Sequence, residues 1–116
     1  MSKLQMGGEW LELDPVNKDV GKLRFKVRPL SSAEQYDNAE AVVKDMKASI
    51  GIINKIILDW ELDLTVDDHP LSCTDENKAT YIPYLIAIEV KGGSGTEGLG
   101  TRILDFAQNF GNFIKN

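Results

Sequence analysis

An apolar seam with helical spacing runs through the middle of this 116-residue chain. Its members recur at gaps of three and four residues: Tyr36, Ala39, Val43, Met46, Ile50, Ile53, Ile57 and Trp60. That spacing places them on one face of an α-helix of about seven turns. Ser49 and Gly51 weaken its middle, which predicts a bent helix or two helices that meet near residue 49. Because the second half is rich in β-branched isoleucine, a strand is the competing interpretation there.

The segment before this seam alternates apolar and polar residues, as a half-buried β-strand does. Residues 22–28 (KLRFKVR) place Leu23, Phe25 and Val27 on one face and four basic residues on the other, solvated face. Residues 9–14 (EWLELD) also alternate, and residues 14–21 contain strong turn formers. We therefore expect an antiparallel hairpin, preceded by a flexible start over residues 1–8. An isolated hairpin is barely stable, so later parts of the chain must cover its apolar face.

Capping signals mark where helices begin. Ser31 or Ser32 can cap the first helix, with Glu34 or Gln35 placed to complete a capping box. Residues 62–72 form a polar connection, with the turn at residues 67–70 (DDHP).

Thr74 can cap a later helix whose first turn is acidic, which suits the helix dipole. Pro83 should end or kink this helix. Its apolar contacts are expected from four residues: Tyr81, Tyr84, Leu85 and Ile88.

The last part of the chain is expected to be a glycine-rich loop followed by an amphipathic helix. Residues 91–100 (KGGSGTEGLG) contain five glycines, which predicts a mobile loop over residues 92–100. The helix should cover residues 101–114, with its apolar stripe formed by Leu99, Ile103, Phe106, Phe110 and Phe113. The predicted fold class is α+β, in one domain of residues 1–116: an N-terminal antiparallel hairpin packed against three or four helices, mainly helical.

Composition narrows the class of protein. The net charge is −5 and the basic residues are scattered, which argues against a dedicated nucleic-acid binder. The single cysteine, Cys73, cannot form an internal disulfide and suits a reducing compartment. The first residues lack the apolar core of a signal peptide, and no apolar run approaches the roughly 20 residues of a membrane helix. We expect a soluble cytoplasmic protein with no membrane or nucleic-acid partner.

Residues with catalytic or metal-binding chemistry are sparse. Asp67, Asp68, His69 and Cys73 lie within seven positions, but His69 is the only histidine and structural zinc usually takes four Cys or His ligands. The glycines of residues 92–100 lack the Lys-Ser/Thr pair of a phosphate-binding loop. The sequence therefore predicts no catalytic residues, no metal site and no cofactor, and favours a protein that is not an enzyme.

Aromatic residues are the better candidates for function. Phe106, Phe110 and Phe113 follow a helical spacing that usually marks a core, but an apolar helix beyond a glycine-rich loop can also bind a partner's groove or close a homo-oligomer. Trp60 has the same two interpretations, core anchor or interface anchor. These four residues are the predicted partner-binding residues.

Several segments resemble tail assembly chaperones of long-tailed phages and prophages. The resemblance lies in residues 56–61 (IILDWE), 66–71 (VDDHPL) and 73–78 (CTDENK), and in residues 25–31 (FKVRPLS), which are similar to the strand that leads into the first helix of those proteins. It covers residues 22–90. His69 stands where a glycine is usual in the turn, and residues 92–116 match no part of the family pattern.

The resemblance implies a non-enzymatic role. Such chaperones bind the tape-measure protein, keep it soluble, help recruit tail-tube subunits and are absent from the finished particle. Self-association is a further expectation. The alternative is a structural minor tail or head–tail connector subunit that stays in the virion; a tube or ring subunit would contain more strand than the sequence predicts. A third interpretation, from another class, is a small metal-dependent or hydrolytic enzyme that uses Asp67, Asp68, His69 and Cys73.

Overall fold

A computed structural model describes residues 8–31, 33–34, 46–92 and 95–115 of the chain. Its elements in chain order are β1 (Glu9–Leu13), the 3-10 turn η1 (Lys18–Val20), β2 (Leu23–Val27), α2 (Met46–Ile56), β3 (Ile57–Leu62), β4 (Thr65–Val66), β5 (His69–Pro70), α3 (Asp75–Leu85), β6 (Glu89–Gly92), β7 (Gly95–Gly98) and α4 (Leu99–Lys115). The α+β class is confirmed. The expectation of a mainly helical fold is wrong, because helix accounts for 41% and three small antiparallel sheets contribute much of the rest.

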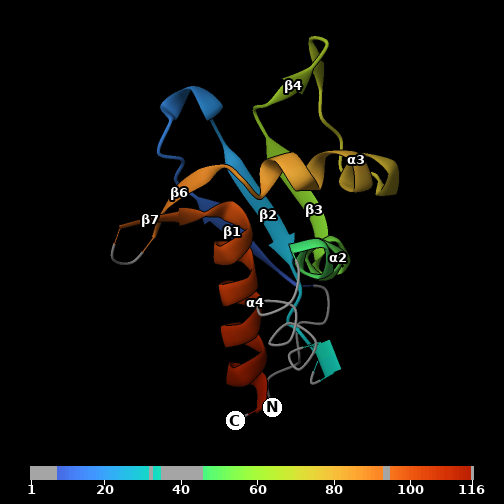
Figure 1. Cartoon of the computed structure of the whole chain (residues 1–116), viewed down its shortest axis with the longest axis vertical. Coiled ribbons are helices and arrows are strands. Elements are labelled where there is room, and N and C mark those ends of the chain that lie inside the picture. Colours follow the sequence, from blue (N-terminus) through green and yellow to red (C-terminus); the bar gives the residue numbers. More distant parts are fainter. Residues whose placement is uncertain (1–7, 32, 35–45, 93–94, 116) are drawn as a thin grey trace.

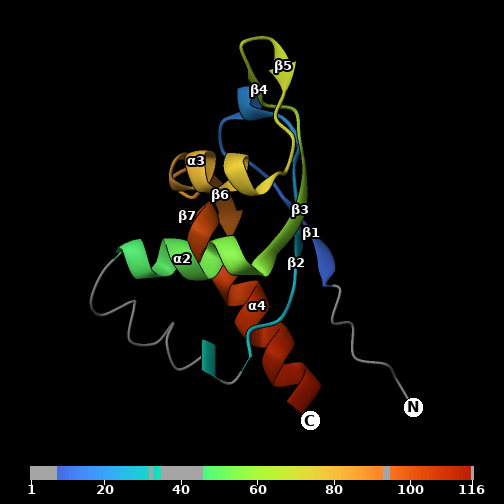
Figure 2. The same ribbon diagram turned by 90° about the vertical axis from the view of Figure 1, so that its right-hand side faces the viewer.

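The predicted N-terminal hairpin is present and forms two strands of a three-stranded sheet. β1 pairs antiparallel with β2, with Leu11 opposite Phe25, and β2 pairs antiparallel with β3, with Phe25 opposite Trp60. Figure 2 shows this sheet nearly edge-on, with α2, α3, β6 and β7 on one side of it and α4 beginning on that same side. The apolar face of the hairpin is therefore covered, as an isolated hairpin requires.

The apolar seam divides into a helix and a strand. The seam positions from Met46 to Ile53 lie in α2, which ends at Ile56. The helix predicted to continue to Trp60 is wrong, since residues 57–62 form β3. The register against β2 shifts between Lys26 and Val27, which is a β-bulge. A bulge adds one residue to a strand, so Ile57 and Trp60 both face the core despite a spacing of three. The seam positions from Tyr36 to Val43 lie outside the described residues, as does the predicted flexible start over residues 1–7.

The core is one cluster to which nearly every element contributes. Its fully buried side chains come from the hairpin, α2, β3, α3, β6 and α4: Leu23, Phe25, Val27, Ile53, Ile56, Ile57, Ile82, Val90, Leu99 and Ile103. Trp60 of β3 also belongs to the cluster. Its ring lies edge-on to that of Phe25, with a centroid distance of 6.2 Å and an interplanar angle of 83°. In the described part of the chain, the buried residues thus form a single hydrophobic core.

The turn predicted at residues 67–70 is present, within a small hairpin that the sequence did not predict. β4 and β5 pair antiparallel, with Val66 opposite His69, so that Asp67 and Asp68 form a two-residue turn. Both aspartates have positive φ, 51° and 64°, as the type I′ turn favoured in such hairpins requires. The hairpin extends from one end of the molecule (Figure 1).

The described residues of the glycine-rich segment form part of a hairpin, β6 and β7, and the start of α4 at Leu99, so the prediction of a loop over residues 92–100 is wrong. β6 and β7 pair antiparallel, with Glu89 opposite Gly98 and Gly92 opposite Gly95. β6 also forms a bridge with the segment after β1, where Val90 lies opposite Pro15. The N–H of Val16 donates to the Glu89 carbonyl at 3.0 Å, and that of Lys91 donates to the Asp14 carbonyl at 2.9 Å. These bonds hold the segment through residues far away in the sequence.

Close packing requires a glycine at position 100, the last glycine of this segment. A Cβ atom at Gly100 would lie 2.9 Å from Cβ of Ile86, too close for any other residue without a shift. The N–H groups of Leu99 and Gly100 donate to the carbonyls of Ile88 and Ile86 at 2.8 and 3.2 Å. Two backbone N–H groups of the first turn of α4 thereby find acceptors in the segment that follows α3.

Candidate interaction surfaces

Thr74 caps α3 as predicted. Its hydroxyl accepts a hydrogen bond from the N–H of Asn77 at 3.1 Å, and Asn77 in turn donates from its side-chain amide to the Ser72 carbonyl at 2.9 Å. α3 continues two residues past Pro83 and ends at Leu85, as a proline near a helix end allows. α3 is therefore anchored at its start, and its position relative to the core is well defined.

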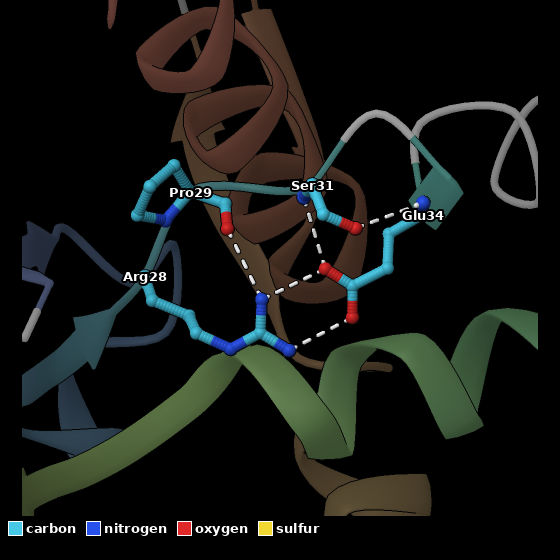
Figure 3. A network of polar contacts seen from close by, with 4 residues as sticks. All are labelled: Arg28, Pro29, Ser31 and Glu34. Carbon is cyan, nitrogen blue, oxygen red and sulfur yellow. Dashed lines mark hydrogen bonds and ion pairs between the residues drawn. The ribbon is translucent and has the colours of Figure 1, made fainter. Parts of the chain in front are cut away.

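The predicted capping box forms between Ser31 and Glu34, and it includes an arginine that the sequence pattern did not indicate. The Ser31 hydroxyl accepts from the N–H of Glu34 at 3.2 Å, and the Glu34 carboxylate accepts from the N–H of Ser31 at 3.0 Å. Arg28 donates to both oxygens of the same carboxylate at 2.8 Å and also to the Pro29 carbonyl (Figure 3). The hydrogen bonds from Arg28 lower the pKa of Glu34 to about 2. Arg28, Ser31 and Glu34 bond to one another and to the backbone, so we interpret the network as structural.

Trp60, one of the four predicted partner-binding residues, lies in the core. Its side chain is 5% exposed, and its indole N–H donates to the Leu71 carbonyl at 2.8 Å. Its surface is used within the domain in this conformation.

The three predicted phenylalanines belong to α4. Phe106 is half-buried and packs against the core beside Ile103 and Ala107, both fully buried. Phe110 and Phe113 fall in the last turns of the helix, where the structure describes the backbone and not the side chains. The N–H of Leu30 donates to the carbonyl of Ala107 at 3.3 Å and joins the segment after β2 to α4.

The candidate polar residues of the connection are not brought together. Asp67, Asp68 and His69 are exposed at the β4–β5 hairpin, whereas Cys73 is half-buried beside Trp60. Burial raises the pKa of the Cys73 thiol, so it carries less thiolate than an ordinary cysteine. Within the described ranges, no group of three or more His, Cys, Asp or Glu side chains is arranged to hold a metal ion.

The face of the sheet turned away from the helices carries alternating charge. β2 supplies the basic side chains Arg24 and Lys26, and the flanking strands place acidic residues opposite them: Glu12 and Glu61 beside Arg24, and Asp59 beside Lys26. Arg24 forms an ion pair with Glu61, and its guanidinium lies 4.7 Å from the Trp10 ring centroid. Arg24 and Lys26 of the basic series thus lie opposite acidic residues.

The most exposed large apolar side chain of the described residues is on α3. Tyr84 was expected to supply an apolar contact, but it is 74% exposed, so that expectation is wrong. The side of α3 that faces the core is formed by Ile82 and Leu85. A signal for an exposed aromatic was present in the sequence: residues 79–88 (ATYIPYLIAI), the second half of α3 and the three residues after it, contain no charged residue.

Comparison of the chain with protein-family models, with curated proteins and with solved structures finds no match. In the described part of the chain, no helix has the length and apolar character needed to cross a membrane.

Proposed function

We propose that this protein is a tail assembly chaperone of a long-tailed phage or prophage. It binds the tape-measure protein in the host cytoplasm, keeps it soluble and aids assembly of the tail tube through reversible protein–protein contacts, without catalysis. The resemblance of residues 22–90 to that family is the origin of the proposal, and a feature of α4 supports it.

The first half of α4 is docked on the core, and the helix continues from there to Lys115. Leu99, Ile103 and Ala107 are fully buried on the same stripe, and the carbonyl of Ala107 accepts from the N–H of Leu30. The helix then extends to Lys115, about two further turns. In Figures 1 and 2 this end of α4 extends beyond α2 and α3.

The sequence of this extension continues the apolar stripe. Phe110 and Phe113 follow Phe106 at gaps of four and three, which keeps them on the face that begins with Leu99. An amphipathic helix end of this kind can lie in the groove of a partner or pair with a helical partner segment. We assign the partner contact to this end of α4, with Phe113 as its central residue.

The test is co-expression with the long tape-measure protein encoded in the same genome, followed by pull-down and light scattering. We expect a stable complex in which the long partner stays soluble. Phe113→Ala should weaken capture, and Gln108→Ala, at an exposed position of the same helix, should not. Thermal melts of both variants show whether the domain is intact. Failure of the wild-type protein to capture or solubilise the partner would refute the proposal.

A second candidate function is a structural minor tail or head–tail connector subunit. The higher strand content, three antiparallel sheets where one hairpin was predicted, favours this alternative more than the sequence did. Protein composition of purified particles separates the two candidates. A structural subunit remains in the particle, whereas a chaperone is absent from it.

A further inference from the structure

α3 carries apolar residues on two opposite sides. Ile82 and Leu85 pack into the core, while the opposite side exposes a set that we define as the α3 outer face: Ala79, Thr80, Pro83, Tyr84 and Ala87. Most amphipathic surface helices place charged residues on their solvent side. From Ala79 to its end at Leu85, α3 instead has seven consecutive uncharged residues, and the next three residues of the chain are also uncharged.

A helix face that carries no charge is normally buried. The α3 outer face departs from that rule most clearly at Tyr84, which is 74% exposed. Tyrosine presents a large rigid surface with a polar end and is enriched in the central contacts of protein interfaces. Pro83 has no N–H and so cannot make the usual helical hydrogen bond to the carbonyl of Ala79.

The charges around the α3 outer face identify the chemistry of its partner. Glu76 precedes Ala79 and Thr80 by three and four residues, which puts it on the same stripe, and the Thr80 hydroxyl donates to the Glu76 carbonyl at 3.0 Å. Asp75 is its neighbour, and neither side chain forms an ion pair with another described residue. Residues 67–76 contain four acidic residues and no Lys or Arg, and Lys78, the one basic residue of α3, follows Glu76 by two positions.

We propose that the α3 outer face docks an amphipathic segment of another protein, apolar at its centre and basic at the end that meets Asp75 and Glu76. A second copy of this chain is a poorer occupant, because each copy carries a net charge of −5 and would bring the same acidic end to the contact. Three turns of helix offer less than the roughly 800 Å² per partner of a standard interface, so the contact is weak and reversible. The inference rests on the proposed function only in requiring a protein partner.

The test uses the full-length protein labelled with ¹⁵N and three synthetic peptides of about 18 residues, five helical turns. The peptides share one stripe of leucine and alanine and differ only at their ends, which carry lysine, glutamine or glutamate. We expect the lysine-ended peptide to shift the amide signals of α3. The glutamate-ended peptide should bind about tenfold more weakly or not at all.

Variants locate the site. Tyr84→Lys should weaken binding of the lysine-ended peptide by about tenfold or more. Leu58→Ser is the matched control, since Leu58 is a 41% exposed apolar residue on β3, and it should bind as the wild type does. The double change Asp75→Asn, Glu76→Gln should reduce the preference for lysine over glutamate ends while the apolar contact persists.

Each contrary result overturns the inference. Equal binding of all three peptides would contradict the charge argument. Shifts of signals from residues outside α3, or normal binding by the Tyr84→Lys variant, would contradict the assignment of the site to α3. Shifts of α3 signals that depend on protein concentration without peptide would show that a second copy is the occupant. If the peptide binds α3 but the tape-measure protein is not captured, the proposed function fails and this inference stands.

Discussion

Arg28 and Glu34 are joined by two parallel hydrogen bonds of 2.8 Å, one from each terminal nitrogen of the guanidinium to each carboxylate oxygen. The ion pair ties the end of β2 to the capping box that comes after it. Because both side chains are half-buried and the geometry is bidentate, this pair has more influence on stability than an ordinary surface ion pair.

Glu34 should make the domain sensitive to acid. Its pKa falls from an ordinary 4.5 to about 2 in the folded state. A lowered folded-state pKa means that its stabilisation is complete above pH 4.5 and is lost as the pH falls toward 2. Glu34→Gln should lower the free energy of unfolding by about 1–3 kcal/mol at pH 7 and flatten its pH dependence below 4.5.

Urea denaturation at pH 7 and at acidic pH measures both effects. Glu97→Gln is the control, because Glu97 meets Arg102 only at 3.8 Å, and we expect a change under about 0.5 kcal/mol. An acid dependence of Glu34→Gln that parallels the wild type would contradict the assignment.

The two tryptophans should differ in their contribution to stability. Trp60→Phe removes the donor to the Leu71 carbonyl and leaves space in the core, so we expect a loss of about 2–4 kcal/mol. Trp10→Phe changes a ring that is 38% exposed beneath Arg24 and should cost less than about 1 kcal/mol. Denaturation followed by circular dichroism checks the energies. Each variant keeps one tryptophan, whose fluorescence reports its burial. The emission of Trp60 in the Trp10→Phe variant should lie at shorter wavelength than that of Trp10 in the Trp60→Phe variant. The reverse order would argue against a buried Trp60.

Alanine at two glycines should have opposite effects. Gly51 lies exposed in α2 with nothing within 4 Å of an added Cβ, so Gly51→Ala should stabilise the protein by about 0.5–1 kcal/mol. Gly21 has φ of +78° and its Cβ would lie 2.7 Å from Cβ of Asp63, whose carboxylate accepts from the N–H of Lys22. Gly21→Ala should therefore destabilise by about 2 kcal/mol. Thermal melts of both variants test the pair, and a shift of the same sign in both would be inconsistent with these environments.

The type I′ turn at Asp67 and Asp68 should respond to glycine. Asp68 has φ of 64°, which glycine adopts without steric cost, so Asp68→Gly should stabilise the β4–β5 hairpin by about 0.5–1 kcal/mol. Asp68→Ala should weaken it by a similar amount, about 1 kcal/mol, because alanine tolerates positive φ less well than aspartate. Hydrogen exchange of the amides of Val66 and His69 reports the local opening of the hairpin. Equal protection in both variants would mean that the turn does not control this opening.

The seam from Tyr36 to Trp60 shows how spacing alone misleads. A gap of three residues between two buried positions fits a helix, yet Ile57 and Trp60 reach the same side of a strand because the bulge inserts one extra residue between them. The bulge exists only in the pairing of β3 with β2, which is some 30 positions earlier in the chain. The β-branched residues correctly indicated a strand in this part of the chain, but they did not indicate where the helix ends and the strand begins.

Sequence alone determined the features that depend on residues a few positions apart. These are the alternation of the first hairpin, the Ser31–Glu34 capping box, the Thr74 cap, the turn at residues 67–70 and the apolar stripe of α4. Each depends on local periodicity or on a side chain that reaches a nearby backbone group.

Tertiary structure decided the features that depend on distant partners. β6, the strand that leads into the glycine-rich segment, bonds to Asp14 and Val16. Trp60 is buried because it packs on Phe25 and bonds to Leu71, and Tyr84 is exposed because the core contacts the opposite side of α3. Glycine content and helical periodicity are the same whether such partners are present or absent. Only the packing of distant elements distinguishes a flexible loop from a strand, and a core aromatic from a surface one.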